Sequence, residues 1–258
     1  MKLQPTKYLG KTKHMRLLAN YCLSISYHDV DDESPEHSHL NPYLSLNLGG
    51  KYLEKGGFSE NTVKPGDVIL RPSDYSHQNT FKEKSNLCFN IEALTKNSAK
   101  ILALLLKKKI YFTCFEIIQI LTKTFNNYLD DELDCLITET ILQKLDIQDT
   151  DRKPAWYFDV MDKVKNDYDQ SLSLNLIADC VSLHPNYLAR KFKSLNGNTL
   201  GDYIRHTRLE NACLKLNSKK RLTDISIDTG FYDQSHFSNS FRKTFDISPR
   251  QLRDKFLG

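Results

Sequence analysis

Two stretches near the C-terminus, residues 176–197 and 224–246, carry the side chains best suited to recognition chemistry. At 100° per residue of helix, each stretch has an apolar stripe and, opposite it, a stripe of amide, hydroxyl and guanidinium groups. The outward residues are Asn186, Ala189, Arg190 and Lys193 in the first stretch, and Ser235, Ser238, Asn239 and Arg242 in the second. Asn and Arg match the paired donors and acceptors of base edges in a DNA major groove, and small Ser and Ala side chains allow close approach. The alternative is an ordinary solvated helix face.

This chemistry divides the polar residues into two predicted groups, both directed at double-stranded DNA. The predicted base contacts are Asn186, Ala189, Arg190, Gln234, Ser235, Ser238 and Asn239. The predicted phosphate contacts are Lys191, Lys193, Arg205, Arg208, Arg242 and Lys243. Base contacts select a sequence, whereas phosphate contacts set the affinity and its dependence on salt. For Arg205 and Arg208, a structural role within their own helix is the alternative.

The two stretches are copies of one degenerate repeat, because the chain matches itself when it is shifted by 48 to 49 residues. Each copy has the pattern of a short helix, a tight turn and a longer helix, which is the order of a helix-turn-helix unit. Ser173 is predicted to cap the first helix of copy one, and in copy two Gly230 supplies the turn and Asp233 caps the second helix. Small residues, Ala178 and Ser226, stand where the two helices of each unit cross. The predicted inward stripes are Leu188, Phe192 and Leu195, and Phe237, Phe241 and Phe245.

Residues 199–217, between the copies, predict one continuous helix. It opens with a capping box formed by Thr199 and Asp202. About 17 residues at a 1.5 Å rise span roughly 25 Å, which is comparable with the ~34 Å between successive major grooves on one face of DNA. One chain is therefore predicted to read two adjacent groove segments.

The first 94 residues show the period-two pattern of β-strands instead. The predicted strands cover residues 21–27, 43–48, 67–70 and 87–91. Turns are expected at Gly49-Gly50, Gly56-Gly57 and Pro65-Gly66, where glycine supplies the backbone freedom that a tight turn needs. Many short strands at this spacing predict a small antiparallel barrel or sandwich.

From Thr95 the apolar period becomes that of a helix, and two amphipathic helices are predicted. Their stripes are Ile117, Ile120, Leu121, Thr124, Phe125 and Tyr128, and Leu133, Leu136, Ile137, Ile141 and Leu145. These stripes either pack within the chain or form the seam of a homodimer. The polar run of residues 146–154 ends in proline and has the composition of a linker.

Charge and cysteine usage narrow the class further. Residues 152–258 hold 18 basic and 12 acidic residues, a net charge of +6, whereas residues 1–151 have a net charge of −2. The basic excess of the C-terminal part favours a nucleic-acid partner for that part alone. The six cysteines form no C-x-x-C pair and are interpreted as reduced thiols. The apolar runs are too short for a membrane span or signal peptide, so a cytoplasmic protein without membrane contact is expected.

The segment "DISIDTGFYDQSHFSNSFRKTFDISPRQLR" closely resembles the C-terminal signature of AraC/XylS transcription regulators, and "LIADCVSLHPNYLARKFKSLNGNTLGDYIRHTRLENACLKL" resembles the half that precedes it. The resemblance covers residues 155–255 and implies a bacterial promoter-binding regulator, with RNA polymerase as a further partner. Three positions depart from the usual pattern. His184 replaces a capping Ser, Asn239 a common Arg, and Asp246 the Gly that usually ends the second recognition helix. Asp tolerates the left-handed conformation, so the fold is expected to persist.

The N-terminal segments "PEHSHLNPYLSLNLGG" and "VKPGDVILRPSDYSH" look like the cupin-type effector domain that many family members carry. His37, His39 and His77 stand where cupin enzymes bind a metal ion, but Tyr43 and Leu44 occupy the region of the expected Glu. The three histidines remain candidate ligands for Zn or Fe, and a metal-free pocket without a cofactor is the expectation. In that pocket, the residues expected to face a small-molecule effector are His37, His39, Tyr43, Arg71, Tyr75 and His77. The alternative is that they are structural residues whose hydrogen bonds are satisfied within the protein.

The predicted fold class is α+β with two domains. A cupin-like antiparallel β-barrel with two following helices precedes an all-α domain of two helix-turn-helix motifs joined by a linker helix. The predicted boundaries are 1–94 for the sensor barrel, 95–145 for helical dimerisation, 146–154 for the linker and 155–258 for DNA binding. The predicted function is that of a regulator controlled by a signal sensed in the N-terminal domain, not that of an enzyme. The alternatives are a metal-dependent cupin enzyme tethered to DNA, and a regulator controlled by a protein partner or by cysteine oxidation.

Overall fold

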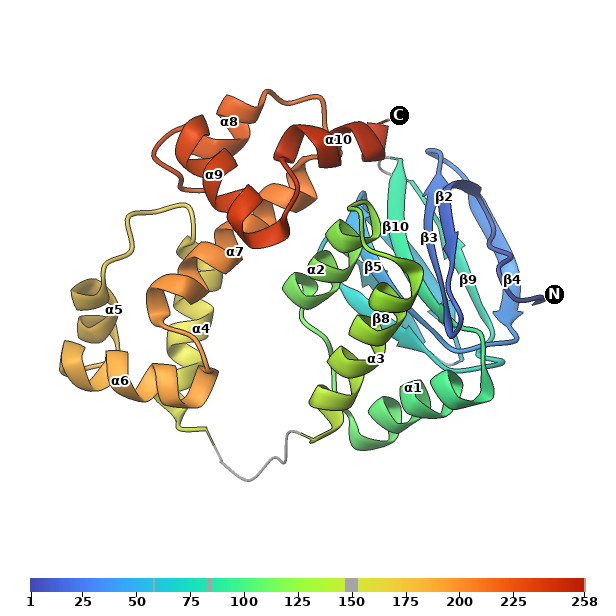
Figure 1. Cartoon of the computed structure of the whole chain (residues 1–258), viewed down its shortest axis with the longest axis horizontal. Coiled ribbons are helices and arrows are strands. Elements are labelled where there is room, and N and C mark those ends of the chain that lie inside the picture. Colours follow the sequence, from blue (N-terminus) through green and yellow to red (C-terminus); the bar gives the residue numbers. More distant parts are fainter. Residues whose placement is uncertain (58, 83–84, 147–152, 258) are drawn as a thin grey trace. The chain divides into compact units, whose positions relative to one another are not determined.

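The computed structural model describes residues 1–57, 59–82, 85–146 and 153–257 (Figure 1). The chain separates into two compact units, Met1–Gln148 and Asp149–Gly258. Within these described ranges, the first unit contains the β-sheets and three helices, and the second contains helices without strands. This arrangement confirms the predicted α+β class. Most of the predicted linker, residues 147–152, lies outside the described residues.

Two five-stranded sheets form the N-terminal unit. The first has the order β1 (Lys2–Leu3), β4 (Glu33–His39), β9 (His77–Thr80), β6 (Tyr52–Gly56) and β7 (Ser59–Val63). The second has the order β2 (Lys11–Leu17), β3 (Tyr21–His28), β10 (Asn86–Ala93), β5 (Tyr43–Gly49) and β8 (Val68–Arg71). Neighbouring strands are antiparallel except β1 and β4, which run parallel.

The central strands β3, β10 and β5 are buried along nearly their whole length, and their two faces differ in polarity. On one face, Leu23, Ile25 and Phe89 lie beside Phe125, at the end of the second helix of this unit. On the opposite face, Ser26 and Asn90 line an internal cavity. The predicted alternation is therefore present, but the polar residues of these strands face the interior rather than solvent.

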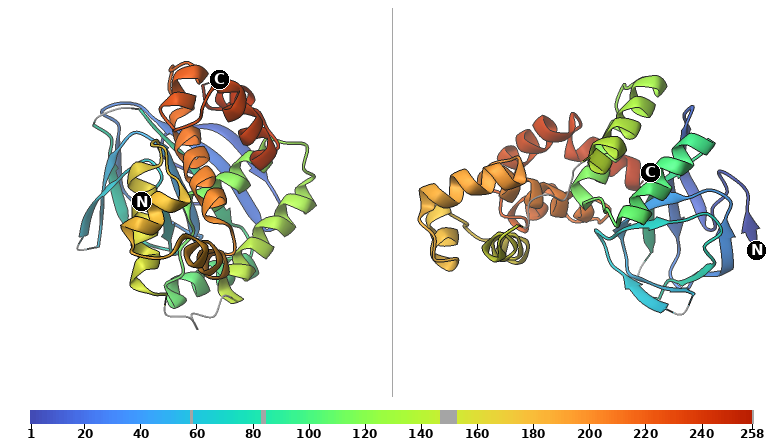
Figure 2. Two further views of the ribbon diagram at one scale, coloured as in Figure 1. Left: turned by 90° about the vertical axis from the view of Figure 1, so that its left-hand side faces the viewer. Right: turned by 90° about the horizontal axis from the view of Figure 1, so that it is seen from below.

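Three helices follow the sheets, one more than predicted: α1 (Lys96–Lys108), α2 (Cys114–Thr124) and α3 (Asp130–Asp146). They lie beside the strands in Figures 1 and 2. Thr95 and Thr113 begin α1 and α2 with capping boxes, and Lys109 in the left-handed conformation ends α1. The helix that was not predicted is α1, because no separate apolar stripe was identified in its run of leucines and lysines.

The predicted stripes of α2 and α3 are used within the chain. Ile117, Leu121, Leu133 and Ile137 each have no solvent exposure. Polar contacts hold the helices to the sheet: Arg16 on β2 donates to Asp130 at 2.7 Å, and the Asn20 backbone amide donates to Asp134 at 2.8 Å. The centre of each stripe is thus buried by packing within the chain, whereas Phe125 and Leu136 are half-buried.

The C-terminal unit consists of seven helices in the described residues 153–257. They are α4 (Ala155–Asp167), α5 (Leu174–Cys180), α6 (Pro185–Asn196), α7 (Leu200–Lys215), α8 (Leu222–Ile227), α9 (Gln234–Phe245) and α10 (Pro249–Leu257). The pairs α5–α6 and α8–α9 are the two predicted helix-turn-helix units, and α7 connects them (Figure 1). At 1.5 Å per residue, the 16 residues of α7 span about 24 Å. None of the helices in the described parts of the chain combines the length and apolar character needed to cross a bilayer.

We expect two glycines of this unit to respond differently to an added methyl group. Gly197 and Gly230 have positive φ values of 80° and 78°. A Cβ at Gly197 would meet nothing within 4 Å, whereas one at Gly230 would lie 2.8 Å from the Tyr168 carbonyl oxygen. Gly197→Ala should lower the free energy of unfolding by about 1–2 kcal/mol through backbone strain alone. Gly230→Ala should cost about 1–3 kcal/mol more, because backbone atoms must move.

The single tryptophan, Trp156, packs against the core of this unit, so its fluorescence during urea unfolding measures both variants. Equal losses of stability in the two variants would show that Gly230 is not packed as described.

Candidate nucleic-acid interface and histidine pocket

The two candidate recognition helices, α6 and α9, are held by buried apolar stripes and by capped N-termini. Leu188 and Phe192 on α6 and Phe237 and Phe241 on α9 have no solvent exposure. Asp233 accepts from the His236 amide at 2.7 Å, which confirms the predicted cap of α9. At α6, His184 takes the capping role of the usual Ser: its Nδ1 accepts from the Asn186 amide at 3.3 Å.

The polar stripes opposite the core face outward, as the helical period requires. Asn186, Arg190, Ser235 and Asn239 are exposed, and Ala189 and Ser238 are half-buried. Gln234 is also exposed, but its side-chain oxygen accepts from the Thr223 hydroxyl at 2.7 Å, which ties it to α8. Asp246 ends α9 in the left-handed conformation, with a φ of 57°, as expected from its tolerance of that region.

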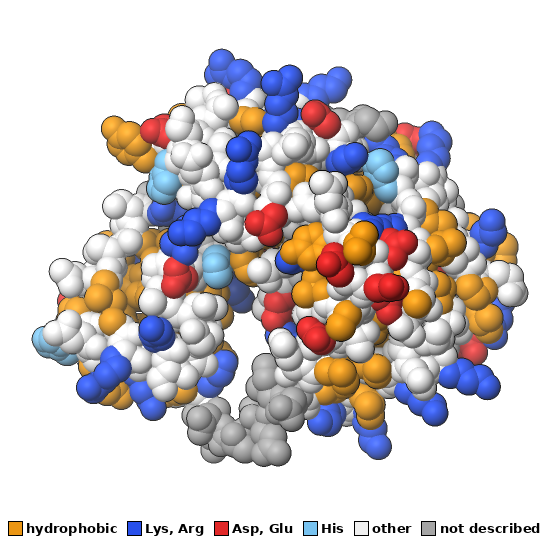
Figure 3. Space-filling model, in the orientation of Figure 1, with side chains coloured by type: hydrophobic (Ala, Val, Ile, Leu, Met, Phe, Trp, Pro, Cys, Tyr) orange, Lys and Arg blue, Asp and Glu red, His pale blue; other side chains and the backbone are white. Residues whose placement is uncertain are grey.

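The cations predicted to contact phosphates divide into two sets. Lys191, Lys193, Arg242 and Lys243 are exposed on the recognition helices. Figure 3 shows basic side chains distributed over the C-terminal unit. On α7, by contrast, Arg205 forms an ion pair with Asp202.

Arg208 on α7 is half-buried and donates hydrogen bonds to backbone carbonyls of its own unit. Its Nε donates to the Tyr168 carbonyl at 2.7 Å, and its terminal nitrogen donates to the Gln170 carbonyl at 2.8 Å. These bonds favour the structural alternative for Arg208 over a phosphate contact.

One exposed residue near the recognition surface was missed by the sequence analysis. Tyr232 is 91% exposed and immediately precedes Asp233, the cap of α9. The sequence did contain a signal for this residue, because Tyr232 is an aromatic residue that lies outside the inward apolar stripe of the second repeat copy. A tyrosine at this end of a recognition helix has the hydroxyl needed to donate to a DNA phosphate.

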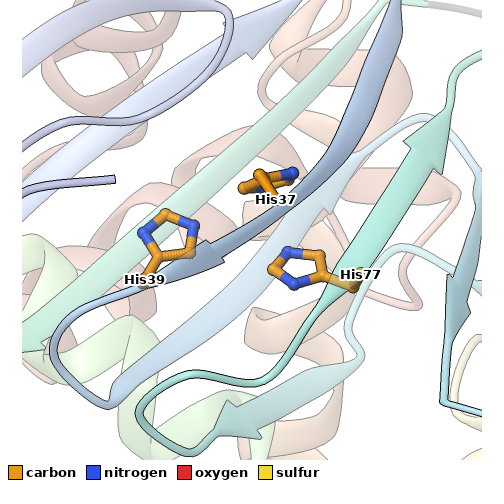
Figure 4. Close-up of side chains that lie close together, drawn as sticks. All are labelled: His37, His39 and His77. Carbon is orange, nitrogen blue, oxygen red and sulfur yellow. The ribbon is translucent and has the colours of Figure 1, made fainter. Parts of the chain in front are cut away.

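A second candidate site lies in the N-terminal unit, where three histidines converge. His37 and His39 are two residues apart on β4 and therefore share a face, and His77 is the direct partner of His37 on β9. The ring centroids of His37 and His77 lie 4.2 Å apart, and those of His37 and His39 lie 5.2 Å apart (Figure 4). One nitrogen from each ring lies within 4.8 Å of the others, and all three residues are buried.

The surroundings keep these imidazoles neutral. Burial lowers the pKa of His39 to about 3 and that of His77 to about 4, and it also lowers the pKa of His37. The Tyr43 hydroxyl lies 3.3 Å from His77 Nε2. The histidines line a cavity of about 40 Å³ together with serine, asparagine and tyrosine side chains.

Arg71 and Tyr75, also predicted to face an effector, are both engaged by the protein. Arg71 Nε donates to the Glu54 carboxylate at 3.1 Å, and a terminal nitrogen donates to the Tyr52 hydroxyl at 3.0 Å. The Tyr75 ring stacks on His77 and covers Gly56, whose missing side chain leaves room for it. Arg71 therefore lines the cavity as half of a buried ion pair rather than as a free cation.

Comparison with known proteins places the helical unit in a family. A sequence model described as a helix-turn-helix domain matches residues 177–255. Regulatory protein SoxS of Escherichia coli is 38% identical over 88 residues, which cover 34% of this chain and 82% of SoxS. The transcriptional activator RhaS of Mannheimia succiniciproducens is 32% identical over 35% of this chain and 34% of its own length. The solved structure of ToxT from Vibrio cholerae aligns with 93% of this chain and all of that chain, at 14% identity and a TM-score of 0.42.

The paired helix-turn-helix units and the sequence match to SoxS define a DNA-binding transcription regulator. The chain belongs to the AraC/XylS family. The resemblance found in residues 155–255 is thereby confirmed.

The buried Arg71–Glu54 ion pair should contribute measurably to the stability of the N-terminal unit. Glu54→Ala leaves Arg71 charged and unpaired in the interior, and we expect a loss of about 3–5 kcal/mol in the stability of the N-terminal unit. Glu60→Ala is the matched control, because it removes the half-exposed Lys55–Glu60 pair on neighbouring strands and should cost less than about 1 kcal/mol. Thermal unfolding followed by circular dichroism measures both. Similar effects of the two substitutions would contradict the buried position of Arg71.

Proposed function

We propose that this regulator reads two adjacent major-groove segments, one with α6 and one with α9. The observation that carries the proposal is the equivalent placement of exposed Asn, Ser and Arg side chains opposite the core in both units. The proposed base contacts are Asn186, Ala189, Arg190, Gln234, Ser235, Ser238 and Asn239. The proposed phosphate contacts are Lys191, Lys193, Arg242 and Lys243, joined by Tyr232. Arg205 is a weaker candidate because Asp202 already neutralises it.

The remaining features of the proposal concern control of DNA binding. The N-terminal unit senses a signal, and the chain acts in the cytoplasm with promoter DNA and RNA polymerase as partners rather than as an enzyme. We retain a homodimer but assign it to the outer face of α3, where Leu142 is 47% exposed, because the predicted stripes are buried. Figure 3 shows apolar and acidic side chains side by side over α2 and α3.

Selection of bound DNA from a random pool, with and without cell extract, tests sequence reading and effector dependence together. The expected product is a motif of two short elements whose centres lie about 10 base pairs apart, one turn of the duplex. Recovery of unrelated sequences under both conditions would refute sequence-specific reading.

Two substitutions on α6 should separate base reading from phosphate binding. Arg190→Ala should weaken binding to the selected site by about 1–3 kcal/mol and relax the preference at one base position. Lys193→Ala should weaken all sequences alike and reduce the slope of log K against log salt by about 1. Fluorescence anisotropy on the selected site and on single-base variants measures both effects. A uniform loss from Arg190→Ala would reassign Arg190 to phosphate contact.

The same titrations distinguish Arg208 from the phosphate contacts. Because its guanidinium binds the carbonyls of Tyr168 and Gln170, Arg208→Ala should lower the urea midpoint of Trp156 fluorescence and leave the salt slope of DNA binding unchanged. Arg242→Ala is the matched control, since Arg242 is exposed and should show the reverse pattern. A reduced salt slope with full stability in Arg208→Ala would return Arg208 to the DNA surface.

A further inference from the structure

Two of the three clustered histidines, His37 and His77, already make the supporting contacts that are usual for metal ligands. His37 Nδ1 lies 2.8 Å from the Pro35 carbonyl oxygen, and His77 Nδ1 lies 3.1 Å from the Tyr75 carbonyl oxygen. A carbonyl oxygen only accepts, so each Nδ1 must carry the proton and each Nε2 must present its lone pair. A metal-ligating histidine usually donates its second ring nitrogen in this way, which fixes the tautomer and the ring orientation.

The cavity around the rings suits an ion better than an organic effector. Its volume of about 40 Å³ holds little more than an ion with a water molecule, and its wall includes Ser26, Ser45 and Asn90. The buried carboxylate of Glu54 is already paired with Arg71. The available ligands are therefore neutral imidazoles, with the Tyr43 hydroxyl beside them, and imidazole favours Zn²⁺ and similar ions over Ca²⁺ or Mg²⁺.

We propose that His37, His39 and His77 bind one divalent transition-metal ion of the Zn²⁺ class inside the N-terminal unit. A tetrahedral ion with bonds of about 2.1 Å holds its nitrogen ligands about 3.4 Å apart. The three ring nitrogens lie within 4.8 Å of one another, so binding must draw the rings together.

The position of the site connects this movement to the sheet. The pairing of β4 with β9 shifts register between Ser34 and His37, so the strands are irregularly joined next to the cluster. An ion shared by His39 and His77 would add a link between these strands at this point. That the ion acts as the sensed signal rests on the proposed regulatory function. That the three histidines bind the ion does not depend on that function.

Metal titration of the full chain, stripped with a chelator, tests the site. We expect one equivalent of Co²⁺ to bind with visible absorption bands typical of low coordination number, and one equivalent of Zn²⁺ to displace it. Loss of one supporting hydrogen bond to a metal ligand typically lowers metal affinity roughly 10–100-fold. His77→Ala removes a ligand itself and should lower the affinity for Co²⁺ by at least that factor. His28→Ala is the matched control: His28 lines the same cavity, but its ring stacks on Phe81 and is not part of the ligand cluster.

The outcomes separate the site from the function. The site is supported if the unmodified protein binds one equivalent of Co²⁺, His77→Ala abolishes this binding and His28→Ala preserves it. The site is refuted if the unmodified protein shows no saturable Co²⁺ binding. An equal loss in both variants, each verified as folded by circular dichroism, also overturns it. A second titration on the selected DNA tests the signal: unchanged DNA affinity with and without Zn²⁺ overturns the regulatory role and leaves the metal site intact. Failure to bind any DNA would instead count against the proposed function.

Discussion

The DNA-facing surface depends on the burial of one apolar stripe along each recognition helix. On α9, the rings of Phe237, Phe241 and Phe245 follow one another at centroid distances of 5.6 and 4.8 Å and are almost fully buried. Each buried side chain of this size contributes about 1.5–3 kcal/mol, several times the value of an exposed polar contact. The core therefore sets the rotation of the helix, and the identity of the outward residues remains free to specify a DNA sequence.

The second constraint is the connection between the two reading helices. Arg208 projects from α7 and binds the carbonyls of Tyr168 and Gln170, ahead of the first helix-turn-helix unit. Its Nε lies 2.9 Å from the position that a side chain on Gly230, in the turn of the second unit, would occupy. One guanidinium thus fills the space where both halves meet α7. The absence of a side chain at Gly230 is a packing requirement as much as a turn requirement.

How much was predictable from the sequence differs between the two units for a physical reason. In the helical unit, the apolar period, the capping residues and the internal repeat all predict the same arrangement of helices. Ser173 and Asp233 therefore cap helices as expected, and Asp246 ends α9 in the left-handed conformation. In the sheet unit, period two located strands but could not tell which face meets solvent, because the apolar face is covered by helices that come later in the chain. The role of Arg208 was equally hidden, since its partners are backbone carbonyls that carry no sequence signal.

The N-terminal unit can hold polar groups in its interior because the two faces of its central strands pack against different surroundings. Helices cover the apolar face of these strands, where Phe125 lies beside Leu23 and Ile25. The inner face carries a smaller apolar cluster that includes Tyr52 and Phe81. Beside this cluster it holds hydrogen-bonded polar groups, such as Asn90 with Ser24 and Ser26. Buried polar groups are tolerated only when they are satisfied, and here they satisfy one another. A cavity walled in this way has a fixed shape and a fixed set of donors and acceptors, which is the condition for discriminating one small ligand from another.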